Sequence, residues 1–577
     1  MNPKSIKTGL LSVAALLTFG STPVLAKDII HDAEHYVLLD KHGDAWAEQD
    51  KEIQKKLKAL RDKHGTPPNI IHIMWDDTPV GEIGIPEIQK MRGFETPNMN
   101  QFREDGVFFT RMYTEPSCTP SRAAAMTGRH ARRNGMYNVG FPYEYGGLAA
   151  EEVTMAEVLT EEGYATAFYG KSHLGDVQSS YLNRQGFDEA FWTPYNQVPS
   201  LYVPRGQLGP LESAVMYPDF YPKDIYELDP DWRPTGYVWV LEGEKGGPVR
   251  EWGTPPNEDD YYEMDRESER RILTFVEKNA EAKKPFYIAY WPQLGSFLGL
   301  NHAGGDKFRT NSGGLLQEGM VRIDDYVAVL EKKLEDLGIR ENTLVILMAD
   351  NGPMTHNGPP GMVETLYRGG KGDYTEGGVR VPFLAKWPGV IEPGSTVGDI
   401  IHITDLFTTF AVLGGASKHI PRDRIIDGVN QTALFFEGDG ESRRDYVHIY
   451  TGPELAATVK GRYKKRWRDA LPGLSGPEFH DLYNDPREHN GKLLPMFPAK
   501  SMFNQMKARH LLWAEKYPHR GQNRDWPLCG IENARPETQA ACEGRIKKMP
   551  FDPNEVIRNL PEFDNVDPGW GVGSGGQ

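Results

Sequence analysis

The sequence has little cysteine, no excess of positive charge and no long hydrophobic run. Its 577 residues include only three cysteines, and 65 Lys and Arg stand against 81 Asp and Glu, for a formal net charge of −16. Three cysteines exclude a disulfide-rich scaffold. The acidic balance argues against a nucleic-acid-binding protein, and it requires local positive charge wherever an anionic substrate binds. The length and composition are those of a globular protein with a large core and a second domain.

The most apolar stretch, residues 10–19, is well short of the roughly 20 residues that span a bilayer. Lys4 and Lys7 precede it, and the small-residue segment 23–26 follows it. This order is typical of a secretory signal with cleavage near Ala26, with a single membrane anchor as the alternative. We therefore expect an exported chain, periplasmic or secreted, with no stable membrane insertion.

The scarce cysteines fit such a compartment. Cys529 and Cys542 lie close together in a loop-rich tail. In an oxidising space they can form a disulfide, and a buried pair of free thiols is the alternative. Cys118 is left as the odd cysteine, which in a secreted chain needs an explanation.

Cys118 opens the segment Cys-Thr-Pro-Ser-Arg, which ends at Arg122. The apolar run 107–113 before it predicts a buried strand, and residues 123–126 predict the first turn of a helix. Such a junction binds anions through free backbone N–H groups and the helix dipole. Arg122 and Arg129 add positive charge there. A lone cysteine is more often a buried structural thiol, which is the alternative.

Two continuous apolar runs, residues 68–75 and 343–349, predict central parallel strands buried on both faces. Open α/β sheets place their sites at the carboxyl ends of such strands. Adjacent carboxylates there are costly unless a cation compensates them, so a hard-metal site is predicted. Asx turns and helix caps are the alternative. The polar residues that follow the two strands are Asp76, Asp77, Asp350 and Asn351.

Together these stretches resemble the type I, formylglycine-dependent sulfatase (arylsulfatase) family of the alkaline-phosphatase-like superfamily. Its signature is C-x-P-S-R followed by a helix that ends in T-G-R, here Thr127-Gly128-Arg129. The resemblance implies that a formylglycine-generating maturation enzyme oxidises Cys118. One hydroxyl of the hydrated aldehyde attacks sulfur, and deprotonation of the other expels sulfate.

The resemblance also implies a set of metal ligands. All-oxygen ligation in an exported protein favours Ca²⁺, with Mg²⁺ as the alternative. The metal would bind the sulfate of the substrate. The implied ligands are Asp76, Asp77, the group derived from Cys118, Asp350 and Asn351.

Two further motifs resemble family elements, Gly-Lys171-Ser-His173-Leu-Gly and the glycine-flanked Lys371 that precedes Glu376-Gly-Gly-Val-Arg. The resemblance implies that Lys171 contacts the formylglycine hydroxyl, that His173 takes the proton that releases sulfate, and that Lys371 binds sulfate. Arg122 completes the implied catalytic set.

One family feature is missing. The family usually has a histidine just after the strand that here covers residues 285–290, where it protonates the leaving group. The nearest histidine in this chain is His302, and we assign that role to it. Substrates with good leaving groups, or protonation from the C-terminal domain, are the alternatives, and His356 and the aromatic segment described next are further candidates.

These patterns predict an α/β protein, an alkaline-phosphatase-like α/β/α sandwich with a mainly parallel sheet and a smaller C-terminal α+β domain. Residues 179–262 are an aromatic-rich insertion that we expect to wall the substrate or to pack as surface. The predicted parts are a signal peptide (1–26), a helical extension (27–67), a catalytic domain (68–420) and a C-terminal subdomain with tail (421–577).

The predicted function is that of an exported sulfuric ester hydrolase acting on a carbohydrate, aryl or alkyl sulfate. A phosphonate or phosphate ester hydrolase on the same scaffold is one alternative, because phosphoryl and sulfuryl oxygens present similar tetrahedra. A non-catalytic glycan-binding relative is another, although it has no use for an oxidisable cysteine beside a metal site.

Overall fold

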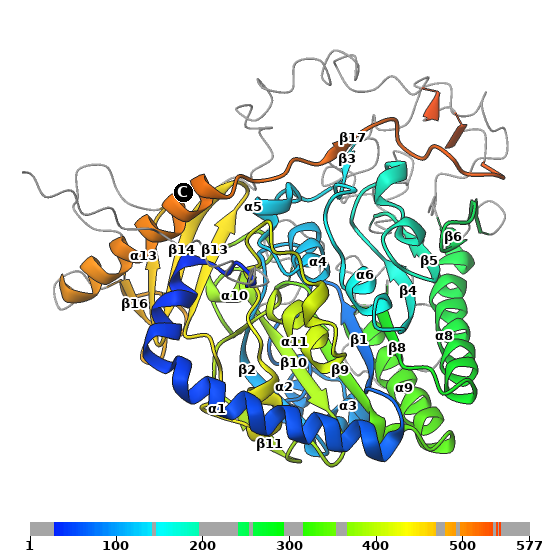
Figure 1. Cartoon of the computed structure of the whole chain (residues 1–577), viewed down its shortest axis with the longest axis horizontal. Helices are drawn as coiled ribbons and strands as arrows, with labels where there is room; N and C mark the ends of the chain where they lie inside the picture. The colour runs from blue at the N-terminus through cyan, green and yellow to red at the C-terminus, as the bar shows by residue number, and fades with distance from the viewer. Residues whose placement is uncertain are drawn as a thin grey trace, which may run out of the picture.

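The computed structural model describes residues 28–140, 146–195, 240–252, 258–292, 315–353, 366–468, 479–491, 497–534, 538–539 and 542–543. A large sheet forms the centre of this part of the chain (Figure 1). The strands in order across the sheet are β11 (Ser395–Val397), β2 (Val107–Tyr113), β10 (Arg380–Lys386), β9 (Thr343–Ala349), β1 (Asn69–Trp75), β8 (Phe286–Trp291), β4 (Ala165–Lys171), β5 (Glu189–Thr193), β6 (Leu241–Glu244) and β7 (Val249–Glu251), and β12 (Ile401–His402) also pairs with β2.

The middle of the sheet is parallel. Strand β1 lies between β8 and β9, so that Ile71 is opposite Ile288 on one side and Val345 on the other. Strands β1, β8 and β9 are buried along their whole length, which explains their continuous apolar sequences. The predicted central strands are confirmed. Since Trp75 pairs with Ala349, the residues after β1 and β9 emerge side by side.

Helices sandwich this sheet in two groups (Figure 1). The first group consists of α3 (Pro97–Glu104), α8 (Glu258–Glu281) and α9 (Leu315–Asp336), and α9 contacts both of the others. The second group is α4 (Cys118–Thr127), α6 (Met155–Thr160), α11 (Asp405–Leu413) and α12 (Thr432–Glu437). The shorter helices are α2 (Pro86–Met91), α5 (Ala131–Asn134) and α10 (Glu376–Val379). The predicted α/β/α sandwich with a mainly parallel sheet is therefore confirmed.

The predicted helical extension is helix α1 (Ala33–His64), which runs along the outside of the molecule (Figure 1). The carboxylate of Asp32 caps its first turn, and Gly65 ends it in the left-handed conformation. Ile53 and Leu57 are buried in the main core, and α1 contacts α12 and α13 (Phe497–Lys516). The extension is thus part of the folded body, and the domain boundaries stay a prediction.

The C-terminal region builds a second, antiparallel sheet. Its strands in order are β13 (Tyr446–Thr451), β14 (Glu454–Lys460), β15 (Tyr463–Arg466) and β16 (Phe479–Asp481). Helix α13 packs against it through Phe503 and Met506. Further along, β17 (Asn523–Arg524) pairs with β3 (Gly146–Gly147), and Cys529 and Cys542 form a disulfide. The predicted disulfide between Cys529 and Cys542 is therefore present, and the alternative of two free thiols is not.

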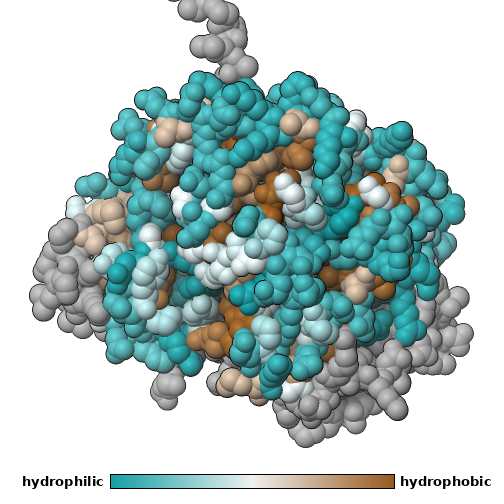
Figure 2. Space-filling view, turned by 90° about the horizontal axis from the view of Figure 1, so that it is seen from below, coloured by the Kyte–Doolittle hydropathy of each residue, from teal (hydrophilic) through white to brown (hydrophobic). Residues whose placement is uncertain are grey.

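The surface agrees with the mean hydropathy of −0.56. Figure 2 shows one face covered mainly by hydrophilic residues, with hydrophobic ones visible in small separate patches. Among the helices of the described ranges, no candidate for a membrane span is found. The predicted signal peptide lies outside those ranges.

Gly170 gives a test of this packing. It has φ 104°, and a Cβ atom there would lie 2.0 Å from the carbonyl oxygen of Trp291 in β8. We expect Gly170→Ala to lower the free energy of unfolding by clearly more than about 1 kcal/mol, because strain and clash add. Thermal and urea unfolding measure this. Gly163→Ala is the control, since Gly163 also has positive φ (80°) but nothing within 4 Å. Equal losses in the two variants would contradict the packing argument.

Candidate active site

Cys118 is the first residue of helix α4, and β2 ends at Tyr113. The predicted strand-to-helix junction is confirmed, but the predicted helix start at residue 123 is wrong by five residues. Pro120 does not delay the helix, because the first turn needs no intrahelical N–H donor. Cys118 is fully buried. As the first residue of α4, it lies beside the first-turn amide groups, which have no acceptor within the helix.

The polar residues that follow β1 and β9 meet as predicted. The backbone N–H of Asp77 donates to Asp350 Oδ1 (3.1 Å), and Asn351 Nδ2 donates to Asp77 Oδ1 (2.7 Å). Asp76 is the first residue after β1 and precedes Asp77, and all four side chains are at most 1% exposed. The alternative of Asx turns and helix caps does not account for the burial of these four side chains together.

Arg122 joins the two strand ends to helix α4. Its Nη2 donates to Asp76 Oδ1 (2.5 Å) and its Nε to Asp350 Oδ2 (2.8 Å). Nη1 donates to the carbonyl oxygen of Lys171 (2.8 Å). The guanidinium is fully buried and lies over the Trp291 ring, 5.3 Å from its centroid. Arg122 therefore contacts the carboxylates of the site.

Two lysines complete the charge balance. Lys171 Nζ lies 2.6 Å from Asp76 Oδ2, and Lys371 Nζ lies 2.9 Å from both carboxylate oxygens of Asp77. The family resemblance implied that Lys171 contacts the formylglycine hydroxyl and that Lys371 binds sulfate. Their ammonium groups here pair with the carboxylates, so three buried cations face three buried carboxylates.

Burial dominates the electrostatics of the site. It raises the pKa of Asp350 to about 7, with a further contribution from the Asp76 carboxylate. For Asp76, burial alone would raise the pKa, but the combined positive charge of Lys171, Arg122 and Lys371 holds it well below its usual range. Burial also raises the pKa of the Cys118 thiol, although Lys171 and Lys371 oppose the shift. An unmodified Cys118 is therefore protonated at neutral pH and is a poor nucleophile.

The donor set suits a hard divalent cation. It consists of the carboxylates of Asp76, Asp77 and Asp350 and the amide oxygen of Asn351. The Asn351 amide nitrogen donates to Asp77 and to the carbonyl oxygen of Gly352. Its Oδ1 is buried and has no hydrogen-bond partner, which is the state expected of a ligand oxygen. The residues present therefore fit the divalent metal that the family resemblance implies.

His173 ends the turn after β4 with φ 55°. Its Nε2 lies 2.8 Å from the carbonyl oxygen of Gly140, so Nε2 carries the proton, while Nδ1 is buried without a partner. Burial and then Lys171 lower the pKa of His173 well below its usual value. The ring is therefore neutral, with a free lone pair on Nδ1. Gly140 N also donates to Thr119 Oγ1 (2.9 Å), which ties His173 to the residue beside Cys118.

Sequence reasoning missed Gly140 and Tyr195. The Tyr195 ring packs edge-on against His173, with centroids 5.9 Å apart, and it belongs to the predicted aromatic insertion. No motif marks either residue. Most of the insertion, His302 and His356 lie outside the described residues.

The expectation for Arg129 is wrong. Its side chain contacts Glu152 and the carbonyl oxygen of Ile425, away from the carboxylate cluster. Arg129 comes after the C-terminal end of α4 at Thr127, and the ten-residue helix that begins at Cys118 is about 15 Å long. Of these two arginines, Arg122 reaches the carboxylates of the site.

A family model described as Sulfatase matches residues 68–416. Arylsulfatase A of Homo sapiens is 34% identical over 520 residues, which cover 85% of this chain and 91% of that protein. N-acetylgalactosamine-6-sulfatase of Canis lupus familiaris is 30% identical over 408 residues, 69% of this chain and 71% of that protein. The crystal structure of the PsFucS1 sulfatase from Pseudoalteromonas sp. aligns with a TM-score of 0.71 and 28% identity over 82% of this chain and 96% of that chain.

The buried Arg122 gives a test of the site. We expect Arg122→Met to lower the free energy of unfolding by about 3–5 kcal/mol, because it leaves Asp76 and Asp350 buried with less compensating charge. Denaturant unfolding measures the change. Arg270→Met is the control, since Arg270 pairs with Glu267 at the surface and such pairs contribute about 0–1 kcal/mol. A similar small loss in both variants would contradict the bridging role.

Proposed function

Because the chain belongs to the sulfatase family, we propose that it is an exported sulfuric ester hydrolase that works through a formylglycine derived from Cys118. One observation carries the proposal. Cys118 lies buried in the first turn of α4, the helix whose Arg122 pairs with Asp76 and Asp350. Lys171 and Lys371 pair with Asp76 and Asp77 in the same cluster. A sulfatase needs a nucleophile, positive charge and hard ligands at one place.

The buried thiol itself supports the need for maturation. Its raised pKa keeps it protonated, and a protonated thiol is a weak nucleophile. The formylglycine hydrate supplies an attacking hydroxyl and a second hydroxyl whose deprotonation releases sulfate, while a divalent metal supplies positive charge at the sulfate oxygens. The maturation enzyme is therefore a proposed partner.

The residues of this chain have distinct proposed roles. Lys171 and Lys371 orient the sulfate and the attacking group by charge, and Arg122 positions Asp76 and Asp350. His173 accepts a proton at Nδ1, because Nε2 is engaged with Gly140 and the ring is neutral. His302 is proposed as the acid that protonates the leaving group.

We propose Ca²⁺ as the metal, held by the oxygen atoms of the site together with the group derived from Cys118, and Mg²⁺ is the alternative. The donor set contains no imidazole, which favours Ca²⁺ and Mg²⁺ over zinc. The proposed ligands are Asp76, Asp77, Asp350, Asn351 and residue 118.

The substrate is a sulfate ester, and the choice among carbohydrate, aryl and alkyl esters is left to experiment. The insertion over residues 179–262 is proposed as the wall that makes this choice, because Tyr195 from it contacts His173. The signal peptide at 1–26 and the domain division at residues 67 and 420 remain proposals as well.

The first functional test concerns Cys118. Protein made together with a formylglycine-generating enzyme should show a mass loss of about 18 Da in the peptide that contains residue 118. It should hydrolyse 4-nitrophenyl sulfate faster than 4-nitrophenyl phosphate or a phenyl phosphonate ester. Cys118→Ala should lower the rate by about 10⁴-fold or more, as loss of a nucleophile does.

Cys529→Ala is the matched control, because it removes a cysteine that lies in the distant disulfide. Full sulfatase activity with an unmodified Cys118 would overturn the formylglycine mechanism. Faster hydrolysis of the phosphate or phosphonate esters would instead show that the protein is a phosphorus ester hydrolase, and it would not contradict the conversion of Cys118 to formylglycine.

The second functional test concerns the metal. Exhaustive dialysis against a chelator should abolish sulfate ester hydrolysis, and Ca²⁺ should restore it. Asp77→Asn should weaken Ca²⁺ binding in calorimetry and lower activity, because it removes a charged oxygen ligand. Asp105→Asn, at a half-exposed ion pair with Lys386, is the control. Undiminished turnover in protein that elemental analysis finds free of metal would refute the site.

A further inference from the structure

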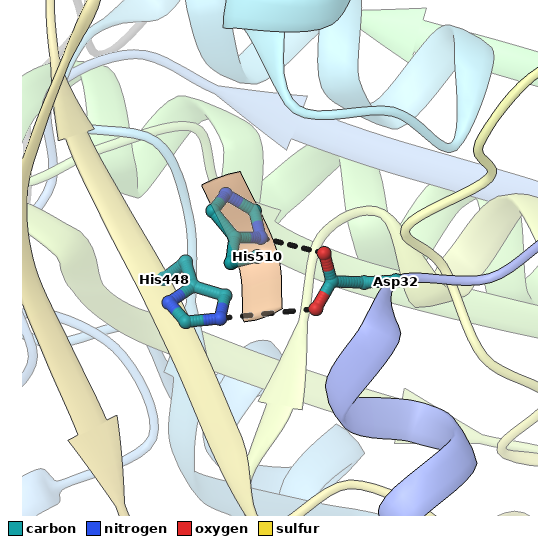
Figure 3. Close-up of side chains that lie close together, drawn as sticks. All are labelled: Asp32, His448 and His510. Carbon is teal, nitrogen blue, oxygen red and sulfur yellow. Dashed lines mark hydrogen bonds and ion pairs between the residues drawn. The ribbon is translucent and has the colours of Figure 1, made fainter. Parts of the chain in front are cut away.

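Three buried side chains far from one another in sequence meet outside the proposed active site. Asp32 precedes α1, His448 belongs to β13 and His510 to α13 (Figure 3). All three are at most 2% exposed, and one nitrogen or oxygen atom from each lies within 4.8 Å of the other two. His510 Nδ1 lies 2.5 Å from Asp32 Oδ1, and His448 Nε2 lies 3.8 Å from Asp32 Oδ2.

Each imidazole has its other nitrogen fixed by a hydroxyl group. His448 Nδ1 lies 3.1 Å from Thr458 Oγ1, and His510 Nε2 is hydrogen-bonded to the hydroxyl of Tyr450. This is how metal-binding histidines are held, with one nitrogen oriented by a hydrogen bond and the other directed at the ion. His448 Nε2 in particular is buried, directed at Asp32 and without a hydrogen-bond partner.

We propose that Asp32, His448 and His510 bind a divalent transition metal of the zinc class. Two imidazole nitrogens and one carboxylate oxygen are ligands that such ions prefer, whereas the oxygen-only active site suits Ca²⁺ or Mg²⁺. The two sites therefore select different metals, and this inference does not depend on the proposed sulfatase chemistry.

Charge at the cluster is consistent with a bound cation. Arg133 Nη2 donates to Asp32 Oδ1 (3.1 Å), but Arg133 is also paired with Asp427 at 2.8 Å. The charges of Arg133 and Asp427 offset one another, which leaves the negative charge of Asp32 for the ion. The backbone N–H of Glu34 donates to Asp32 Oδ2 (3.2 Å) and keeps the carboxylate in place.

Binding requires one proton to move. In the ion-free cluster His510 Nδ1–H donates to Asp32 Oδ1, and Nε2 accepts from the Tyr450 hydroxyl. With the ion bound, Nδ1 supplies its lone pair, the ring proton moves to Nε2 and is donated to the Tyr450 oxygen, and the hydroxyl hydrogen of Tyr450 turns away from the ring. No proton leaves the cluster and no oxidant is needed.

Such an ion would join three parts of the fold that lie side by side in Figure 1, namely the start of α1, the C-terminal sheet and α13. Its binding stabilises only the folded chain, since Asp32 and His510 are 478 residues apart in sequence. The site is therefore structural.

The test is a zinc titration of the full-length protein in a metal buffer, with excess Ca²⁺ present to occupy the oxygen-only site. We expect one equivalent of Zn²⁺ to bind and to raise Tm. Co²⁺ should give a visible absorption band typical of nitrogen ligation. His448→Gln and Asp32→Asn should lose both signals, and Thr458→Val should weaken affinity about 10–100-fold by freeing the His448 ring.

Two controls separate this site from others. His419→Gln alters a histidine paired with Glu162 at the edge of the fold, and Asp77→Asn alters the proposed active site; both should keep the Zn²⁺ equivalent. Absence of saturable Zn²⁺ and Co²⁺ binding by the wild type overturns the proposal, as does equal binding by His448→Gln. If His448→Gln does not fold, the wild-type titration and the Thr458→Val affinity decide.

Discussion

The arrangement of the site depends on one buried guanidinium. Arg122 is the side chain from helix α4 that bridges Asp76 after β1 and Asp350 after β9. Burying such charges is costly unless every one is paired and hydrogen-bonded. The pairing therefore fixes where α4 begins relative to the carboxyl edge of the sheet, and with it the position of Cys118, four residues before Arg122. The position of Cys118 therefore depends on the ion pairs of Arg122 as well as on the packing of the hydrophobic core.

The same balance explains why the lysines contact carboxylates. With three carboxylates and three cations buried together, Lys171 and Lys371 are held by Asp76 and Asp77. A divalent cation on these carboxylates would compensate their charge and leave the lysines available to an anion. The lysine–carboxylate contacts of this structure would then belong to the cluster without a cation, and the roles implied by the family resemblance would belong to the cluster with one. Binding of metal and binding of sulfate should be coupled for this reason.

The sequence predicts well what depends on local pattern. Buried parallel strands are continuous apolar runs, so β1 and β9 were predictable almost to the residue, and the edge where Asp76 and Asp350 meet followed from their common direction. The start of α4 could not be predicted in this way, because a proline such as Pro120 is as acceptable inside the first turn of a helix as before it. Gly140 and Tyr195 reach His173 from irregular segments, and no periodicity marks such contacts.

The burial of Cys118 also constrains when its chemistry can happen. The side chain, in the first turn of α4, is fully buried, so an enzyme that oxidises it cannot reach it in the folded protein. The proposed maturation must precede folding of the sheet edge. Contacts between distant parts of the sequence form slowly, and Arg122 cannot pair with Asp350 until 228 further residues have been added to the chain. The late completion of the site thus leaves time for a modification that the finished core excludes.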